Sequence, residues 1–148
     1  MPESFVARLS GFQARLARRR LATLDGAVRR RRAVAAGYSQ WLAAHGKTAP
    51  FEPEPGGHAF LRYPIRVWER DAFVEEADRR GVMLGDWFHS PLYPIDDNLE
   101  RWGYRRGSSP VAERVSAEIV NLPVDVAPGG SELRAVHELL EACADRIA

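Results

Sequence analysis

The sequence predicts an α+β (α/β) fold with a long N-terminal helix, followed by a small, partly antiparallel sheet on which helices pack. Three observations support this prediction. Apolar side chains recur at helical spacing over residues 10–44. Apolar and polar residues alternate over residues 61–68, as in a strand with one buried face. A second helical stripe near the end of the chain consists of Leu133, Val136, Leu140, Cys143 and Ile147.

Residues 10–44 are predicted to form one long helix or two helices placed end to end. At 1.5 Å per residue a single helix would be roughly 50 Å long. That length exceeds the radius of gyration of about 15 Å expected for a domain of this size. Gly26 or Gly37 could introduce a kink, and His45-Gly46 is typical of a helix end. The apolar positions of the segment are Phe12, Leu16, Leu24, Val28, Ala35, Tyr38 and Leu42.

A linker, a strand and a helix are predicted next. Residues 50–57 contain three prolines, which exclude a helix there. Pro64 cannot donate to a ladder hydrogen bond, so the following strand is expected to lie at a sheet edge or beside a bulge. Asp71 is predicted to cap a helix that reaches Arg80 and stops at Gly81. The apolar face of the strand consists of Leu61, Tyr63, Ile65 and Val67.

The remaining elements are a short strand, a helix, another strand and a final helix. Residues 82–84 are predicted to form a short buried strand. Ser109 is a suitable N-cap, and Pro110 suits the first turn of the helix that follows. Residues 119–122 are predicted to form a strand, and Ser131 to cap the last helix.

A long loop, residues 85–108, lies between the predicted short strand at residues 82–84 and the helix that Ser109 caps. Loops of this length are usually functional or disordered, and its aromatic content argues against disorder. Residues 87–94 place large aromatics between prolines, which could wall a pocket or could pack down on the domain's own sheet. The aromatic residues of the loop are Trp87, Phe88, Tyr93, Trp102 and Tyr104.

Composition predicts a cytoplasmic protein that does not associate with membranes. Of 148 residues, 45% are hydrophobic and 28% charged, as in ordinary globular domains. No apolar run approaches the ~20 residues of a membrane span, and the N-terminus lacks an apolar signal core. The single cysteine, Cys143, excludes an internal disulfide and a cysteine zinc cluster, and its place on an apolar stripe predicts a core residue.

Charge is unevenly distributed along the chain. Residues 1–46 carry nine arginines against Glu3 and Asp25, a net charge of +7, whereas residues 47–148 have a net charge of −6. A basic segment can bind nucleic acid, with a steeply salt-dependent affinity. However, no DNA-recognition motif and no interleaved aromatic platform accompanies the arginines. A solvated or partner-facing helix is therefore favoured over nucleic-acid binding.

No motif predicts catalysis or a metal site. His45, His58, His89 and His137 lack the spacing of metal ligands. His89 is close in sequence to Asp86 and Ser90, but the members of a catalytic triad converge from separate elements. A surface or pocket-lining role is therefore predicted for His89.

Several segments, in order, resemble one enzyme family. The segments are residues 10–14 and 21–25, the arginine-rich residues 32–42, residues 70–82, Pro110-Val111-Ala112-Glu113 and Asn121-Leu122-Pro123. Together they resemble the small C-terminal domain of the DegT/DnrJ/StrS family of sugar aminotransferases. This resemblance implies the small-domain fold of fold type I aminotransferases, with a bridging helix region at residues 1–46 and the small domain at residues 47–148.

The resemblance implies an enzyme that uses pyridoxal phosphate to move an amino group from glutamate or glutamine to a keto-sugar nucleotide. In that family a lysine of a large N-terminal domain holds the cofactor. The only lysine here, Lys47, does not match the family's Schiff-base motif. We therefore expect no catalytic and no cofactor-binding residue in this chain alone, with pyridoxal phosphate belonging to the complete enzyme. The expected partner is a second copy, or a separate chain that carries the pyridoxal phosphate domain.

The resemblance also implies substrate-binding residues, namely Arg8, Trp87, His89 and Tyr93. The family often has Asn-x-Arg where Val6 and Arg8 stand, and His-Tyr-Pro-x-Pro-x-His around Pro91. These departures point to a different acceptor. Two alternatives remain open: a non-catalytic interaction or dimerisation module that uses the long basic helix, and nucleic-acid binding through that helix.

Overall fold

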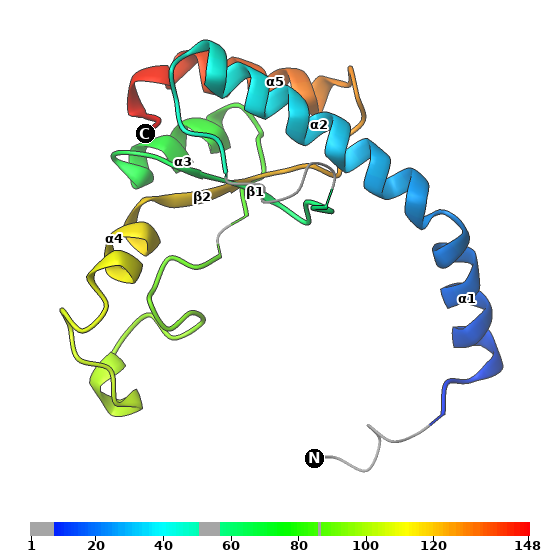
Figure 1. Cartoon of the computed structure of the whole chain (residues 1–148), viewed down its shortest axis with the longest axis horizontal. Coiled ribbons are helices and arrows are strands. Elements are labelled where there is room, and N and C mark those ends of the chain that lie inside the picture. Colours follow the sequence, from blue (N-terminus) through cyan, green and yellow to red (C-terminus); the bar gives the residue numbers. More distant parts are fainter. Residues whose placement is uncertain (1–7, 51–56, 86) are drawn as a thin grey trace.

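In a computed structural model that describes residues 8–50, 57–85 and 87–148, the chain has the predicted α+β fold (Figure 1). Val6 and most of the predicted linker at residues 50–57 lie outside the described residues. Short 3₁₀ helices occur at Leu99–Trp102 and Ala144–Arg146. The main elements are α1 (Gly11–Ala22), α2 (Leu24–Ala44), β1 (Tyr63–Arg66), α3 (Arg70–Arg79), α4 (Pro110–Glu118), β2 (Ile119–Leu122) and α5 (Ser131–Ala142).

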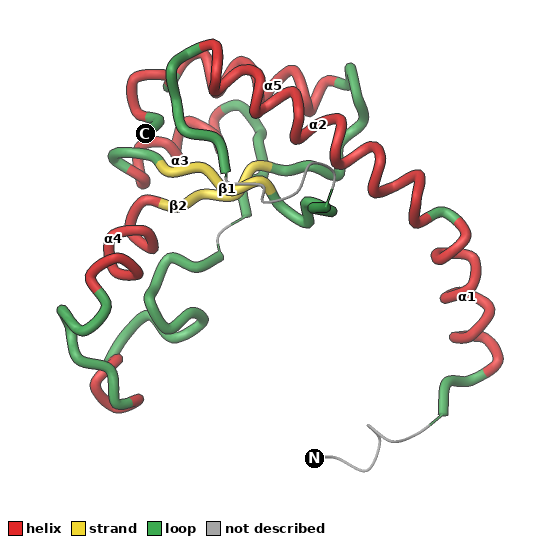
Figure 2. The backbone as a smooth tube through the Cα atoms, in the orientation of Figure 1, coloured by secondary structure: helices red, strands yellow, loops and turns green. Residues whose placement is uncertain are grey.

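β1 and β2 pair in an antiparallel sheet with Tyr63 opposite Leu122 and Arg66 opposite Ile119. Figures 1 and 2 show α2 and α5 side by side along one side of this sheet. The segment that joins α3 to α4 lies on the other side. Alternate residues of β1 are buried, as the sequence pattern predicts. The sheet therefore separates a helix-covered core from the long loop.

The N-terminal segment forms two helices end to end, and the break between them falls at Thr23 rather than at either glycine. The Thr23 hydroxyl donates to the Arg20 carbonyl at 3.0 Å, which terminates α1. At its other end, Ser10 and Gln13 form a reciprocal capping box. Among the predicted apolar positions, those in the second half of α2 are buried, while Phe12, Leu16 and Leu24 are exposed. Only the C-terminal part of this helical pair therefore belongs to the core.

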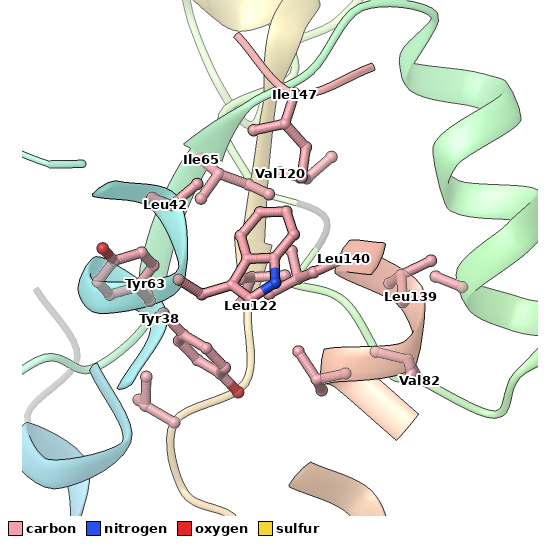
Figure 3. Close-up of a cluster of buried hydrophobic side chains, with 14 of the residues drawn as sticks. Tyr38, Leu42, Tyr63, Ile65, Val82, Val120, Leu122, Leu139, Leu140 and Ile147 are labelled. Carbon is pink, nitrogen blue, oxygen red and sulfur yellow. The ribbon is translucent and has the colours of Figure 1, made fainter. Parts of the chain in front are cut away.

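The core is formed where α2, α3 and α5 cover the inner face of the sheet (Figure 3). Tyr38 of α2 contacts Tyr63 of β1 edge-on, with ring centroids 5.3 Å apart. Burying a side chain of this size contributes about 1.5–3 kcal/mol. The core side chains labelled in Figure 3 are Tyr38, Leu42, Tyr63, Ile65, Val82, Val120, Leu122, Leu139, Leu140 and Ile147.

The end of the chain extends the sheet beyond β1. Ile147 forms an antiparallel bridge with Val67, and the Ala148 amide donates to the Arg66 carbonyl at 2.9 Å. The Thr48 amide donates to the Ala148 carbonyl at 3.3 Å. The predicted stripe therefore continues past the end of α5, and Cys143 and Ile147 are buried in the core as expected.

The predicted apolar face of β1 was wrong at its first position. Leu61 is 62% exposed, and Phe60 is buried instead. Phe60 has a left-handed backbone (φ 48°), which interrupts the alternation, and its ring stacks on Tyr63 with centroids 5.8 Å apart. Alternation holds only where the strand is paired, from Tyr63 onward.

Two predicted helix caps lie one or two residues inside their helices. Glu69 occupies the N-cap position of α3, because Arg70 already has helical geometry and donates to the Ile119 carbonyl at 3.1 Å. Asp71 instead lies in the first turn, where a carboxylate favours the helix dipole. Similarly, Ser131 is the first residue of α5, and Gly130 is its N-cap.

The predicted strand at residues 82–84 does not form. Gly81 has φ +68°, and the Val82 amide donates back to the Ala77 carbonyl at 2.9 Å. That amide therefore completes the end of α3 and cannot pair with the sheet. Among described residues of this segment, Gly85 makes the pairing with β2, since its amide donates to the Asn121 carbonyl at 2.8 Å.

Candidate functional site

The long loop, residues 85–108, is attached to the sheet by the side chain of Asn121. The residue is 4% exposed, and its Nδ2 donates to the Gly85 carbonyl at 3.3 Å and to the Trp87 carbonyl at 3.5 Å. A buried amide needs such partners to offset its lost hydration. Asn121 therefore fixes the backbone from which the aromatic part of the loop begins.

The loop brings two of the predicted site residues into contact. The His89 and Tyr93 rings meet edge-on with centroids 5.3 Å apart, and Phe88 lies 5.5 Å from Tyr93. His89 Nε2 is 3.6 Å from Asp96 Oδ2. The Ser90 hydroxyl donates to the Ile95 carbonyl and accepts from the Leu92 amide at 3.2 Å. These bonds hold the turn within the loop, so the aromatic cluster is built largely by local contacts.

His89 lies between two polar hollows. One, of about 200 Å³, is lined on its polar side by Asp96, Tyr104, Arg106 and Glu113. The other, of about 680 Å³, lies toward the first turn of α3. Side chains of both charges line these hollows, as in sites that bind polar groups. The residues around the larger hollow are Glu69, Arg70, Asp71, Ala72, His89, Ser116 and Ala117.

Glu113 of α4 organises the end of the loop. Its Oε1 accepts from the Tyr104 hydroxyl at 2.7 Å and from the Gly107 amide at 2.6 Å. These bonds stabilise the carboxylate and lower the pKa of Glu113, with the Tyr104 hydroxyl as the largest cause. The same hydrogen bond raises the pKa of Tyr104. Glu113 is thus an acceptor that closes the loop onto α4.

Acidification is expected to release this end of the loop. The folded pKa of Glu113 lies below its ordinary value of 4.5, so the contribution of its bonds is complete above pH 4.5. That contribution is lost as the pH falls through the folded pKa. The check is the chemical shift of the Gly107 amide during an acid titration. Glu113→Gln should already show the released shift at neutral pH, whereas an acid-insensitive Gly107 amide would contradict the prediction.

The other two predicted site residues lie apart from the His89–Tyr93 contact. Trp87 is 38% exposed and lies under the guanidinium of Arg62, whose Cζ is 5.3 Å from the ring centroid. Arg8 is exposed just before α1. Figure 1 shows the start of α1 and the long loop on opposite sides of the view. Three of the four predicted residues therefore belong to the loop, but among the described contacts only His89 and Tyr93 touch each other, and Arg8 lies outside the loop.

An apolar hollow of about 410 Å³ lies elsewhere, between the chain end, β1 and α4. None of the four predicted residues lines it. Lys47 is half-buried nearby, and its Nζ donates to the Ile147 carbonyl at 2.7 Å. The residues around this hollow are Thr48, Ala49, Pro50, Pro64, Ile65, Arg66, Trp68, Val115, Ile119 and Ala148.

Three residues that organise the site were not singled out from the sequence. Glu113 and Asn121 belong to the two short motifs at residues 110–113 and 121–123, so their polar side chains were visible signals in otherwise apolar surroundings. Arg62 belongs to the alternating pattern of residues 61–68, where it could be taken for an ordinary solvated position. Its stacking on Trp87 depends on tertiary structure.

The described residues contain neither a membrane-spanning helix nor a metal-binding cluster. Within the described ranges, no helix combines the length and the apolar character needed to cross a bilayer. Across those same residues, no three His, Cys, Asp or Glu side chains gather in a way that could hold a metal ion.

The fold is that of one part of solved sugar aminotransferase structures. The structure of DesV from S. venezuelae, solved in complex with a ketimine intermediate, matches with a TM-score of 0.77 and 27% identity, over 95% of this chain and 38% of that one. CalS13 from Micromonospora echinospora, at 22% identity and a TM-score of 0.63, shares the fold over 82% of this chain and 32% of that one. Residues 4–141 match the DegT/DnrJ/EryC1/StrS aminotransferase family, and the chain belongs to this family.

Sequence relatives agree with this assignment. The dTDP-3-amino-3,4,6-trideoxy-alpha-D-glucose transaminase of Micromonospora megalomicea subsp. nigra is 33% identical over 80% of this chain and 33% of its own length. The dTDP-3-amino-3,6-dideoxy-alpha-D-galactopyranose transaminase of Aneurinibacillus thermoaerophilus is 26% identical over 89% of this chain and 36% of its own. The chain thus spans about a third of the length of these relatives.

The family is pyridoxal-phosphate-dependent, and the residues described here do not fit a covalent cofactor site. Such a site requires a lysine amine free to bond to the cofactor. The single lysine of the sequence instead donates to a main-chain carbonyl beside the chain end. No chemical step through the cofactor can be derived from these residues.

Proposed function

We propose that these residues are the small C-terminal domain of a sugar-nucleotide aminotransferase, and that another polypeptide segment supplies pyridoxal phosphate and the lysine that holds it. The observation that supports this most is the family match over residues 4–141 in a chain about a third as long as its relatives. In this role the domain contributes a wall of the substrate site and is inactive by itself. The cytoplasm is the compartment we propose for the enzyme.

The substrate wall is the exposed face of the long loop. Trp87, His89 and Tyr93 present aromatic surface beside polar hollows, an arrangement suited to a ligand with both flat and hydroxylated parts. Arg8, which is exposed just before α1, would contact such a ligand in the complete enzyme. We further propose that the missing surface comes from a second copy or from a separate chain with the cofactor domain.

Lys47 allows a direct test of the proposal that the chain is inactive by itself. Because its Nζ is bonded to the Ile147 carbonyl, the 148-residue chain is expected to retain no covalent pyridoxal phosphate after reduction with borohydride and gel filtration. Absorbance and intact mass measure this. Lys47→Arg is the matched control, since it keeps the charge and cannot form the bond. A cofactor adduct in the parent chain that is absent from Lys47→Arg would overturn the proposal.

Restoration of activity tests the enzymatic half of the proposal. The chain is co-expressed with a candidate polypeptide that carries the family's cofactor domain, and the pair is purified through a tag on one member. Aminotransfer to a dTDP-keto-sugar by the pair, and by neither member alone, is the expected result. Stable co-purification without aminotransfer would reject the enzymatic role.

A non-catalytic interaction module is the second candidate, and the exposed apolar side chains of α1 and its flanks favour it. Such a stripe, rimmed by arginines, is typical of a surface that another protein covers. If the chain is such a module, it should form a defined oligomer or complex by light scattering without any aminotransfer activity. The exposed apolar residues are Leu9, Phe12, Leu16, Leu21 and Leu24.

A further inference from the structure

Two arginines in and next to β1 lie over tryptophan rings, and they differ in whether a carboxylate pairs with the guanidinium. Arg66 of β1 has its Cζ 5.9 Å from the Trp68 ring centroid, and Arg62 has its Cζ 5.3 Å from that of Trp87. Contacts of this kind hold the planar guanidinium in place and leave its N–H groups available at the edge. The two pairs offer a comparison within one molecule.

Arg66 is neutralised by a carboxylate. Its Nε and Nη2 lie 2.6 Å and 2.5 Å from Glu118 Oε2. Glu118 is the last residue of α4 and is itself mostly buried. The donors of Arg66 therefore already have an anionic acceptor within the domain, and little capacity remains for a ligand.

Arg62 has no such acceptor among the described residues. Its Nε is buried without a hydrogen-bond partner, and no described carboxylate lies within ion-pair distance of its guanidinium. A methyl group added at Gly85 would lie 3.5 Å from this Nε, which shows how closely the loop backbone covers it. A buried Nε–H without an acceptor is costly, so an anion that binds this guanidinium is expected to complete the arrangement.

Exposed aromatic surface lies beside Arg62. Trp87 is 38% exposed and Phe88 is 55% exposed. Phe88 also has a left-handed backbone, with φ +66°, a conformation that costs free energy in a bulky residue and is often found at ligand sites. The Arg62 guanidinium therefore contacts the accessible ring of Trp87, and the exposed ring of Phe88 follows in the sequence.

We propose that Arg62 is a substrate-binding residue that pairs with the diphosphate of a nucleoside diphosphate sugar, while the ring of Trp87 both orients the guanidinium and borders the ligand. This inference rests on the proposed function, which supplies the substrate class. The fork of N–H groups on arginine matches phosphate oxygens in a bidentate geometry. The aromatic rings suit the flat base of the nucleoside. Arg62 would then help to select phosphorylated sugars over free ones.

The test measures anion binding directly, with the 148-residue chain and three probes: inorganic pyrophosphate, thymidine diphosphate and thymidine. Affinity is measured by calorimetry, and the Arg62 Nε–H signal is followed by NMR. Pyrophosphate and thymidine diphosphate should shift that signal, and thymidine should not. Arg62→Gln should weaken pyrophosphate binding about tenfold, the usual loss for a charge-assisted hydrogen bond. Arg62→Lys should recover part of that loss.

Two variants serve as controls. Arg66→Gln removes the same side chain from the neighbouring tryptophan pair and should change the affinity by less than about twofold. Asp86→Asn removes the carboxylate next to Trp87 in the sequence and should also leave affinity unchanged. A large gain of affinity in Asp86→Asn would overturn the inference, because Arg62 would then be an internal ion-pair partner.

The probes separate this inference from the proposed function. If pyrophosphate and thymidine diphosphate bind with equal affinity and both depend on Arg62, the anion site is supported. The proposal that the substrate is a nucleoside diphosphate sugar is then rejected. If thymidine diphosphate shifts the signals of Phe88 and Tyr93 but is insensitive to Arg62→Gln, the proposed function stands and the role of Arg62 is rejected. Unaltered Arg62 Nε–H in the presence of both phosphorylated probes also rejects it.

Discussion

Tyr38→Ala is expected to lower the free energy of unfolding by about 3–5 kcal/mol, the range for truncating a large aromatic in a core. Tyr38, labelled in Figure 3, is completely buried, and its ring contacts those of Tyr63 and His137. Its hydroxyl donates to the Pro123 carbonyl at 2.8 Å. The loss is comparable with the whole stability of many domains of this size. Urea denaturation followed by circular dichroism measures it.

Tyr38→Phe separates the ring from its hydroxyl. This variant keeps the packing and leaves the Pro123 carbonyl without its donor, so it should cost about 1–2 kcal/mol. Burial raises the pKa of Tyr38 above its ordinary value of 10.0, so the contribution of the neutral hydroxyl is complete below pH 10.0 and declines at higher pH. Equal losses in the two variants would show that the ring is not packed as described.

Gly85→Ala is expected to lower the free energy of unfolding by about 2 kcal/mol and to displace the start of the long loop. An added methyl group would lie 3.0 Å from the Asn121 Cβ, which is fixed in β2 and cannot withdraw. The clash forces apart the Gly85 amide and the Asn121 carbonyl. Denaturation measures the energy, and the amide shifts of Trp87 and Phe88 report the displacement.

Gly37→Ala is the matched control for that change. Gly37 lies within α2, and apart from its chain neighbours and its own helix backbone no heavy atom stands within 4 Å of the position its methyl group would take. Alanine there should raise the free energy of unfolding by about 0.5–1 kcal/mol, because glycine loses more backbone entropy in a helix. If both substitutions were stabilising, the close approach of Gly85 to Asn121 would be wrong.

Most elements of the fold were predictable because their signals are local. The alternation around Tyr63 and Ile65, the proline after Ser109 and the glycine after α3 each act within a few residues of the chain. Local signals do not decide which of two apolar neighbours enters the core. The alternating pattern predicts that Leu61 is buried, but because Phe60 has a left-handed backbone, Phe60 is buried and Leu61 is exposed.

The break between α1 and α2 shows the same limit. Glycines are the usual places to expect a kink, yet the helix ends at Thr23, whose hydroxyl bonds the preceding turn. The packed part of α2 begins well beyond that point. Tertiary contacts, which the local pattern does not contain, decide how much of an amphipathic segment is buried.

The candidate site was predictable in its location but only partly in its contacts. Aromatic content identified the long loop, and the structure brings His89 and Tyr93 together there. One anchor of the loop, Glu113 of α4, bonds Tyr104 and Gly107, which are close to it in the sequence. The other anchor, Asn121 of β2, bonds Gly85 and Trp87, which lie far from it along the chain. Pairings between such separated residues cannot be read from spacing in one sequence.

The strand-like pairing of Ile147 and Ala148 with the end of β1 has a consequence for biosynthesis. Residues near position 66 meet their neighbours only after residues near position 148 have been made. Because this contact also involves Thr48, three segments that are far apart in the sequence meet at one place. These particular contacts can form only after residues 147 and 148 have been synthesised.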